Sequence, residues 1–157
     1  MPVRALANED IDDLAPVLKH AFAMDPGLRW IIPGEAEWDR IAVPWFTMML
    51  KDAVTFGRGI TDEGYRGVSL WEPPGASRTL PAKLAGLVRT AMMLRGNLAR
   101  AIQVQSHLER FHPGRPYWYL TYIATDPGHQ GEGIGGALLA PVLHLADRQR
   151  APVFLEC

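Results

Sequence analysis

The sequence predicts an α/β sandwich, in which helices cover the faces of a sheet. Residues 117–125 are rich in β-branched and aromatic side chains and are followed by Asp126, Pro127 and Gly128, which predicts a strand that ends in a turn. Residues 133–150 then place apolar side chains on one helical face, which predicts a helix directly after that turn. Further strand and helix candidates alternate upstream, and this alternation is typical of an α/β fold.

Residue spacing and turn residues define the remaining elements in chain order. The strand candidates are residues 3–6, 55–61, 66–71, 117–125 and 152–157. The helix candidates are residues 9–22, 38–56, 83–108, which form one or two helices, and 133–150. Gly64 and Tyr65 predict a hairpin turn between the second and third strands. We expect Pro16 to kink the first helix or to mark its start, since proline cannot donate to the helical ladder.

The segment between the first two helices is predicted to be irregular. Asp25, Pro26 and Gly27 favour a turn, and residues 29–34 are expected to form a loop that carries Trp30.

Composition limits the classes of function. A chain of 157 residues predicts one domain, residues 1–157, with an ordinary core. The formal net charge of −1 gives no global field that would recruit nucleic acid or an anionic membrane, so neither is an expected partner. Cys157 is the only cysteine, which excludes an intramolecular disulfide framework. With no apolar leader or membrane span in the sequence, we expect a cytoplasmic protein that holds no metal.

The segment that carries most of the chemistry is the glycine-rich turn at residues 126–136. Its glycines leave backbone N–H groups uncovered and allow a ligand to approach the main chain. The first N–H groups of the following helix have no internal partner and carry the positive end of the helix dipole. This combination predicts a site for a pyrophosphate.

Two motifs fit this turn. Read from Gly131, it matches G-x-G-x-x-G, with Glu156 lying 20 residues after Gly136, as in a dinucleotide-binding site. Read from Gln130, it matches Q-x-x-G-x-G, a coenzyme A signature. The dinucleotide fold needs its first glycine almost directly after the strand and further βαβ units downstream, which this chain lacks. The second interpretation is therefore favoured.

From residue 117 onward the sequence resembles the GNAT acyltransferase superfamily, and within it the puromycin N-acetyltransferase-like enzymes. The residues that carry the resemblance are Trp118 to Leu120, Ile123 to Pro127, His129 to Gly131, Gly133 to Gly135, and Pro152 to Glu156. The resemblance implies a GNAT-type mixed, mostly antiparallel central sheet flanked by helices. It also implies acetyl-CoA as co-substrate and a primary amine of a small molecule as acceptor.

The resemblance places the coenzyme in a V-shaped opening between the strand that ends at Thr125 and the strand that ends at Glu156. Backbone groups of Ile123, Ala124 and Thr125 would pair with the pantetheine arm, as an added strand does. The pyrophosphate would lie on the turn, whose residues are Gln130, Gly131, Glu132, Gly133, Ile134, Gly135 and Gly136. Glu132 departs from the family's preference for a basic residue, and we expect its side chain to point into solvent.

The implied reaction is direct attack by an amine on the thioester, which needs positioning, a base and polarisation of the carbonyl. Glu72 and Tyr119 are the catalytic candidates, although a charge at a strand end and core packing are the plainer roles. Strand alternation places Tyr119 and Thr121 on one face and Tyr122 on the other. His107 and His112 are not spaced as a metal pair, and we expect them at the surface or as caps.

Trp30, with Trp38 and Trp45, is a candidate for the acceptor pocket. The alternative is that these indoles bury the first helices against the sheet.

GNAT chains normally continue beyond the last predicted strand. The sequence apparently lacks the usual C-terminal strands and helix, so we expect either a fragment or a sheet that another chain completes, as in a homodimer through the open strand edge. Two further functions stay open: a non-catalytic acyl-CoA-binding module and a dinucleotide-dependent oxidoreductase. The acceptor amine and the acyl chain are not determined by the sequence.

Overall fold

The computed structural model describes residues 2–76 and 79–156, and within them five strands form one sheet in the order β1-β2-β3-β4-β5. The strands are β1 (Val3–Ala5), β2 (Arg58–Asp62), β3 (Gly67–Glu72), β4 (Trp118–Thr125) and β5 (Val153–Phe154). Neighbouring strands from β1 to β4 pair antiparallel, whereas β4 and β5 pair parallel. The predicted mixed, mostly antiparallel sheet is confirmed.

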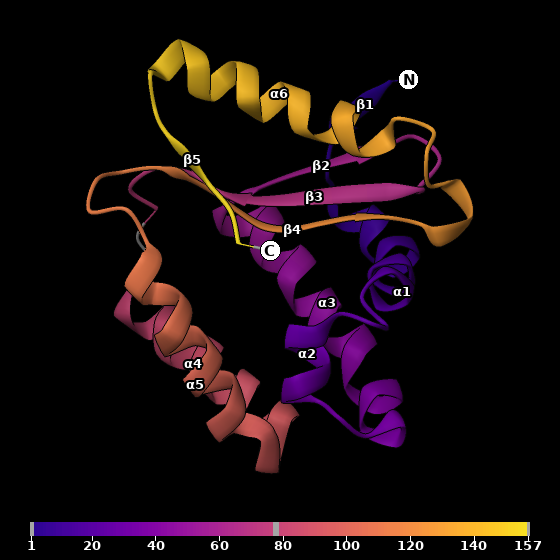
Figure 1. Ribbon diagram of the computed structural model, residues 1–157, viewed down its shortest axis with the longest axis vertical. Coiled ribbons are helices and arrows are strands. Elements are labelled where there is room, and N and C mark those ends of the chain that lie inside the picture. Colours follow the sequence, from indigo (N-terminus) through magenta and orange to yellow (C-terminus); the bar gives the residue numbers. More distant parts are fainter. Residues whose placement is uncertain (1, 77–78, 157) are drawn as a thin grey trace.

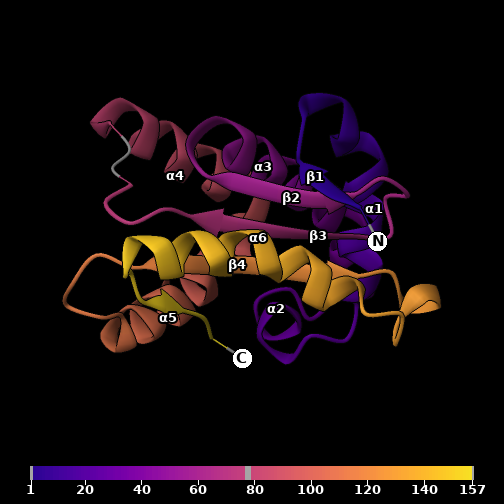
Figure 2. The same cartoon turned by 90° about the horizontal axis from the view of Figure 1, so that it is seen from above.

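Helices cover both faces of this sheet (Figure 1). The helices are α1 (Ile11–Ala21), α2 (Pro26–Ile31), α3 (Glu35–Phe56), α4 (Leu80–Leu94), α5 (Leu98–Leu108) and α6 (Ile134–Gln149). Helix α6 lies alone on one face, and the other helices lie on the opposite side; Figure 2 shows α6 running along the sheet above β3 and β4. In the described part of the chain no helix has the length and apolarity needed to span a membrane.

The two faces of the sheet have separate cores. Helix α6 buries the stripe Ile134, Leu138, Val142 and Ala146, as its helical spacing predicted. These side chains pack against a set from the sheet that comprises Ile60, Trp71, Trp118 and Leu120. On the opposite face α1 and α3 pack against a second set that comprises Val68, Leu70 and Ala124. Each strand in the middle of the sheet is therefore buried on both sides.

Two predictions that rested on proline are wrong. Helix α1 begins at Ile11 and contains Pro16 in its interior, so proline does not mark its start, while the expected kink stays a prediction. Asp25 and Pro26 begin a helix rather than a turn, because the Asp25 carboxylate accepts the Leu28 N–H at 2.7 Å and proline occupies the first helical turn. Trp30 therefore lies on α2 and not on a loop.

The β2–β3 hairpin forms where the sequence predicted, although β2 begins three residues later because α3 continues to Phe56. Tyr65 takes the left-handed conformation in the turn, with a φ of 54°. The buried Asp62 carboxylate holds the turn by accepting backbone N–H groups of Gly64, Arg66 and Gly67 and the Arg66 side chain. Burial alone would raise the pKa of Asp62, but these hydrogen bonds lower it overall.

A β-bulge in β4 changes which side chains share a face. Leu70 pairs with Tyr122 and Trp71 pairs with Leu120, so Thr121 is the extra residue. Leu120 packs in the α6 core, whereas Tyr122, only two residues later, packs in the α1–α3 core. The predicted alternation is therefore wrong, since the bulge turns Tyr122 to the face that Thr121 and Tyr119 share.

Candidate functional site

Strands β4 and β5 pair over only two residues and then separate. Trp118 pairs with Val153 and Tyr119 with Phe154. Beyond Tyr119, β4 continues to Thr125 and pairs with β3 alone, and no strand among the described residues lies along its other edge. Figure 1 shows β5 crossing β4 at a steep angle. The backbone edge of β4 from Leu120 to Thr125 is thus available to an extended ligand.

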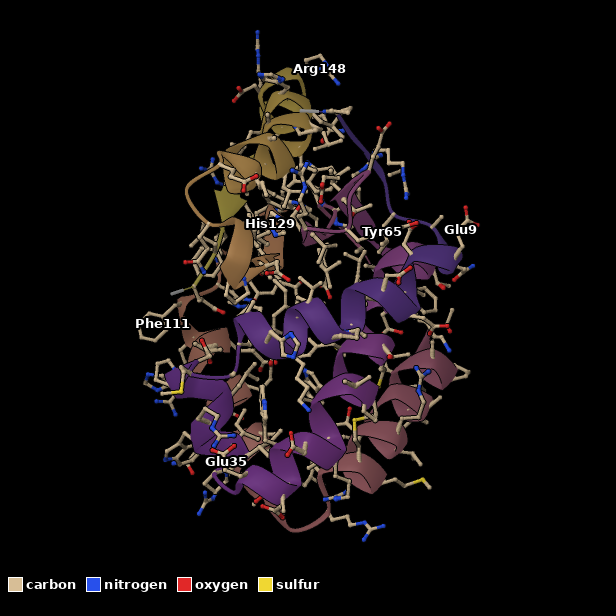
Figure 3. All side chains as sticks on the ribbon, turned by 90° about the vertical axis from the view of Figure 1, so that its right-hand side faces the viewer. Glu9, Glu35, Tyr65, Phe111, His129 and Arg148 are labelled. Carbon is tan, nitrogen blue, oxygen red and sulfur yellow. The ribbon has the colours of Figure 1, made fainter. Side chains whose placement is uncertain are left out.

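The glycine turn joins the open edge to α6. Asp126 accepts the Gly128 N–H on Oδ1 at 2.7 Å and donates its own N–H to the Arg66 carbonyl, which fixes the end of β4 against the hairpin. Gly131 and Gly133 have φ values of 84° and 79°, a region that other residues adopt at a cost of about 1–2 kcal/mol. His129 lies at this turn, where the orange ribbon of β4 passes towards α6 (Figure 3).

The N-terminus of α6 has the features of an anion site. The first helical hydrogen bond runs from the Ala137 N–H to the Gly133 carbonyl, so the preceding N–H groups have no partner within the helix. No acidic residue lies in the first turn. A Cβ added at Gly135 or Gly136 would meet no atom within 4 Å, which leaves room beside the backbone. These groups could hold a phosphate.

Glu132 lies in the turn as an exposed side chain, and its carboxylate is 3.4 Å from Arg66 Nη1. The expectation that this side chain points into solvent agrees with its exposed fraction of 47%. A guanidinium beside it reduces the unfavourable effect of its charge on a bound phosphate.

The two catalytic candidates are cross-strand neighbours. Glu72 at the end of β3 pairs with Tyr119 of β4. Next to them a cavity of about 100 Å³ extends towards α3, and Thr121 of the bulge lines it. Its other lining residues are Met49, Asp52, Ala53, Phe56, Gly57, Leu70, Trp71, Glu72 and Ala76. The cavity thus combines apolar walls with two carboxylates beside the open edge of β4.

A chain of hydrogen bonds closes the narrow end of the opening. The Tyr119 hydroxyl donates to Glu156 Oε2 at 2.7 Å, and His112 Nε2 lies 2.9 Å from Glu156 Oε1. His112 Nδ1 lies 2.7 Å from the Tyr117 hydroxyl. The rings of His112, Tyr117 and Tyr119 all contact Phe154 of β5.

His112 caps the short 3-10 helix Glu109–Phe111, where its N–H donates to the Glu109 carbonyl at 3.4 Å, so the expected capping role is confirmed, and its side chain has a further role. It is half-buried between aromatic rings and reaches Glu156 across 44 residues of sequence. The sequence predicts Glu156 as the end of the last strand or as the acid of a dinucleotide site, and not as a partner of His112. No local pattern indicates this cluster, because it forms only when β5 pairs with β4.

The environment of Tyr119 favours its protonated form. Burial, and then the hydrogen bond to the Glu156 carboxylate, raise the pKa of Tyr119 far above its ordinary value. Burial likewise raises the pKa of Tyr117, with the charges of Glu72 and Glu156 adding to the effect. Both phenols therefore keep their protons at neutral pH and can donate hydrogen bonds.

The three tryptophans of the proposed acceptor pocket lie in different surroundings. Trp38 is buried against Phe46, and the Trp45 Nε1–H donates to the Tyr122 hydroxyl at 3.2 Å, so both help to pack α3. Trp30 is 46% exposed and lines a separate hollow with residues of α5. Trp30 as a pocket residue stays a prediction.

Residues 2–76 and 79–156 contain no group of three or more His, Cys, Asp or Glu side chains placed to hold a metal ion. Cys157 lies outside the described residues.

The comparison with known proteins finds the same family that the sequence of the glycine turn resembles. Residues 83–157 match the model of the acetyltransferase (GNAT) family. An uncharacterized N-acetyltransferase of Schizosaccharomyces pombe (strain 972 / ATCC 24843) is 22% identical over 169 residues, which cover 99% of this chain and 68% of that protein.

Solved structures share the fold. The structure of histone acetyltransferase HPA2 and related acetyltransferase from Corynebacterium glutamicum ATCC 13032 superposes with a TM-score of 0.64 at 26% identity, covering 99% of this chain and 75% of that one. A GNAT family acetyltransferase from Brucella melitensis in complex with acetyl-CoA superposes with a TM-score of 0.50 at 16% identity, covering 98% and 73%.

The matches and the sheet together show that this chain is similar to GNAT acetyltransferases in sequence and in fold. The dinucleotide interpretation needs successive parallel βαβ units, whereas β4 and β5 are the only parallel neighbours in the part of the chain that the structure describes.

Proposed function

We propose that this chain transfers an acetyl group from acetyl-CoA to a primary amine of a small molecule, by direct attack of the amine on the thioester. The observation that carries the proposal is the open edge of β4, which leads directly into the glycine turn and the N-terminus of α6. An extended arm that ends in a pyrophosphate fits such a combination of strand edge and helix terminus.

In this proposal the pantetheine amides pair with backbone groups of Ile123, Ala124 and Thr125. The pyrophosphate accepts hydrogen bonds from N–H groups between Gly131 and Gly136, and Gln130 begins this cradle. A backbone N–H of β4, at Ile123 or Thr125, polarises the thioester carbonyl in the manner of an oxyanion hole.

The acceptor amine approaches through the cavity that Thr121 lines. Met49 and Phe56 offer contacts to an apolar body there, and the carboxylates of Glu72 and of Asp52, which lies 3.7 Å from Arg89 Nη2, also line the cavity. Trp30 lies outside this cavity and would act only on a larger acceptor. A small-molecule acceptor and a cytoplasmic location follow from the resemblance to puromycin N-acetyltransferase-like enzymes and from the composition.

The test is a calorimetric titration of the chain with acetyl-CoA, with NADH as the control ligand. Saturable binding of acetyl-CoA alone is the expected result, and binding of NADH alone would contradict the proposal. Release of the coenzyme thiol is then followed with n-butylamine, 2-phenylethylamine and spermidine as acceptors. Acetyl-CoA binding without turnover of any amine would instead favour an acyl-CoA-binding module.

The short pairing of β5 leaves its outer edge open among the described residues, and we propose a homodimer through it. Light scattering tests this association, since a mass that is independent of concentration and equal to one chain would contradict it.

A further inference from the structure

The Tyr119–Glu156 hydrogen bond spans the point at which the two strands diverge. Tyr119 and Phe154 are the last paired residues of β4 and β5, and Glu156 follows Phe154 by two residues. The phenol of one strand and the carboxylate of the other therefore meet at the apex of the opening, 2.7 Å apart.

The rest of the chain of hydrogen bonds holds the carboxylate in place. One protonation pattern that satisfies every group has His112 donating from Nε2 to Glu156 and the Tyr117 hydroxyl donating to His112 Nδ1. Packing of Phe154 against the rings of His112 and Tyr119 restricts the rotamers of both. Glu156 is thus oriented by two donors, one on each carboxylate oxygen, and each oxygen keeps a further lone pair.

The proposed binding mode of the coenzyme brings its thioester to this apex. With the pyrophosphate at α6, the arm runs back along β4 from Thr125 towards Thr121. These four residue steps span about 13 Å at roughly 3.3 Å per residue. The reacting carbonyl then lies close to Thr121, two residues from Tyr119 on the same face of the strand.

We propose that Tyr119 and Glu156 are the proton-transfer pair of the acetyl transfer, with His112 and Tyr117 as residues that position Glu156. This inference rests on the proposed function and assigns the proton carriers within that site. Neither group is used by coenzyme binding, and Tyr119 is the cross-strand neighbour of Glu72, which lines the cavity.

Tyr119 and Glu156, together with water, account for every proton that moves in the reaction. The acceptor ammonium first loses one proton to water, and the neutral amine forms the N–C bond. As the C–S bond breaks, its electron pair leaves on sulfur, and the Tyr119 hydroxyl gives its proton to that sulfur. The nitrogen gives its second proton to Glu156. Glu156 then returns a proton to the Tyr119 phenolate across their hydrogen bond, and the products are the amide and the free coenzyme thiol.

The electrostatics fit this order of events. Burial, and then the hydrogen bond to Glu156 and its charge, raise the pKa of Tyr119 and hold the phenol protonated; the part due to Glu156 arises because a phenolate beside a carboxylate is unfavourable. Once Glu156 accepts a proton that penalty disappears, and Tyr119 becomes a better donor at the moment when the thiolate forms. Tyr122 and Glu72 also act on Tyr119 in the same direction as Glu156.

The experiment compares Tyr119→Phe and Glu156→Gln with Tyr65→Phe as the matched control, since Tyr65→Phe removes the same hydroxyl from a hairpin tyrosine whose partner is Asp10 and not Glu156. Acetyl-CoA and the best acceptor among n-butylamine, 2-phenylethylamine and spermidine are the substrates. We expect kcat to fall about 100-fold or more in the first two variants, the range of general acid–base catalysis, and to stay at the wild-type value in the control. The calorimetric Kd for acetyl-CoA should change less than threefold in all three.

Two further measurements separate proton transfer from a structural role. Glu156→Ala should regain turnover when formate is added, because an external carboxylate can accept the proton, whereas a lost structural contact would not be restored. Circular dichroism and melting temperature confirm that each variant is folded.

The outcomes distinguish this inference from the proposed function. Wild-type turnover in Tyr119→Phe, with the wild-type chain active, would overturn the proton-transfer pair alone. Acetyl-CoA binding by the wild-type chain without turnover of any amine would overturn the proposed acetyl transfer. Failure of the folded wild-type chain to bind acetyl-CoA would overturn the proposed function itself.

Discussion

A carboxylate placed in the first turn of α6 tests whether this helix end binds the pyrophosphate. Gly136 is exposed at the third helical position after Gly133, and a Cβ there would meet no atom within 4 Å. Gly136→Asp is therefore accommodated without displacing other atoms, and Gly136→Asn is its uncharged control of the same shape. The new charge should have opposite effects on folding and on binding.

The magnitudes follow from the positive end of the helix dipole. A carboxylate about 7 Å from one phosphate charge weakens binding by about 0.6 to 2.4 kcal/mol for effective dielectric constants between about 80 and 20. Relative to the Asn variant, the Kd for acetyl-CoA should thus rise roughly 3- to 60-fold per phosphate charge. The same charge should stabilise the helix by about 0.3–1 kcal/mol.

Calorimetry at low salt gives the Kd values, and urea unfolding gives the stabilities. The difference in Kd should shrink in about 1 M salt, where the Debye length falls to about 3 Å. Equal affinities of the Asp and Asn variants at low salt would refute the assignment of the pyrophosphate to α6.

Two further predictions concern the fold around the site. Asp62→Asn should cost about 3 kcal/mol in urea unfolding at neutral pH, because it breaks a buried ion pair with Arg66. Since the folded pKa of Asp62 is lowered from 3.8, the charged group stabilises the fold above that pH and the benefit is lost as the pH falls through the folded pKa. A gap between wild type and variant that is the same at neutral pH and at about pH 2.5 would contradict this. Gly57→Ala should lower the melting temperature, because its Cβ would lie 2.4 Å from the Trp71 carbonyl oxygen. Gly86→Ala, in the interior of α4, should instead stabilise the fold by about 0.5–1 kcal/mol, because its Cβ would meet no atom within 4 Å. A rise of the melting temperature in both glycine variants would show that the close approach at Trp71 costs no free energy.

The glycine turn could be predicted from sequence because its signal is local. The positive φ of Gly131 and Gly133 is a requirement of single residues, and a strand, a turn and a helix follow one another without interruption. Local signals also predicted a helix start at Pro16 and a turn at Asp25, and both of these predictions are wrong. Packing against the sheet carries α1 through its proline, and a capping carboxylate converts an expected turn into α2.

The catalytic neighbourhood could not be predicted in this way. The bulge that turns Tyr122 to the face of Thr121 depends on how β3 and β4 pair, and strand alternation alone gives the opposite result. The contact between His112 and Glu156 joins residues 44 positions apart. Their sequence neighbours predicted a surface or capping role for His112 and allowed a ribose-binding role for Glu156.

The sequence by itself determined the element order, the glycine turn and the family resemblance, because these depend on side-chain periodicity and on backbone conformations of neighbouring residues. The tertiary structure alone decided where β4 and β5 separate, which side chains line the cavity between α3 and the sheet, and which groups meet at the apex of the opening. The physical reason is that hydrogen bonds and burial between distant segments arise only when the strands pair, and no residue carries that information alone.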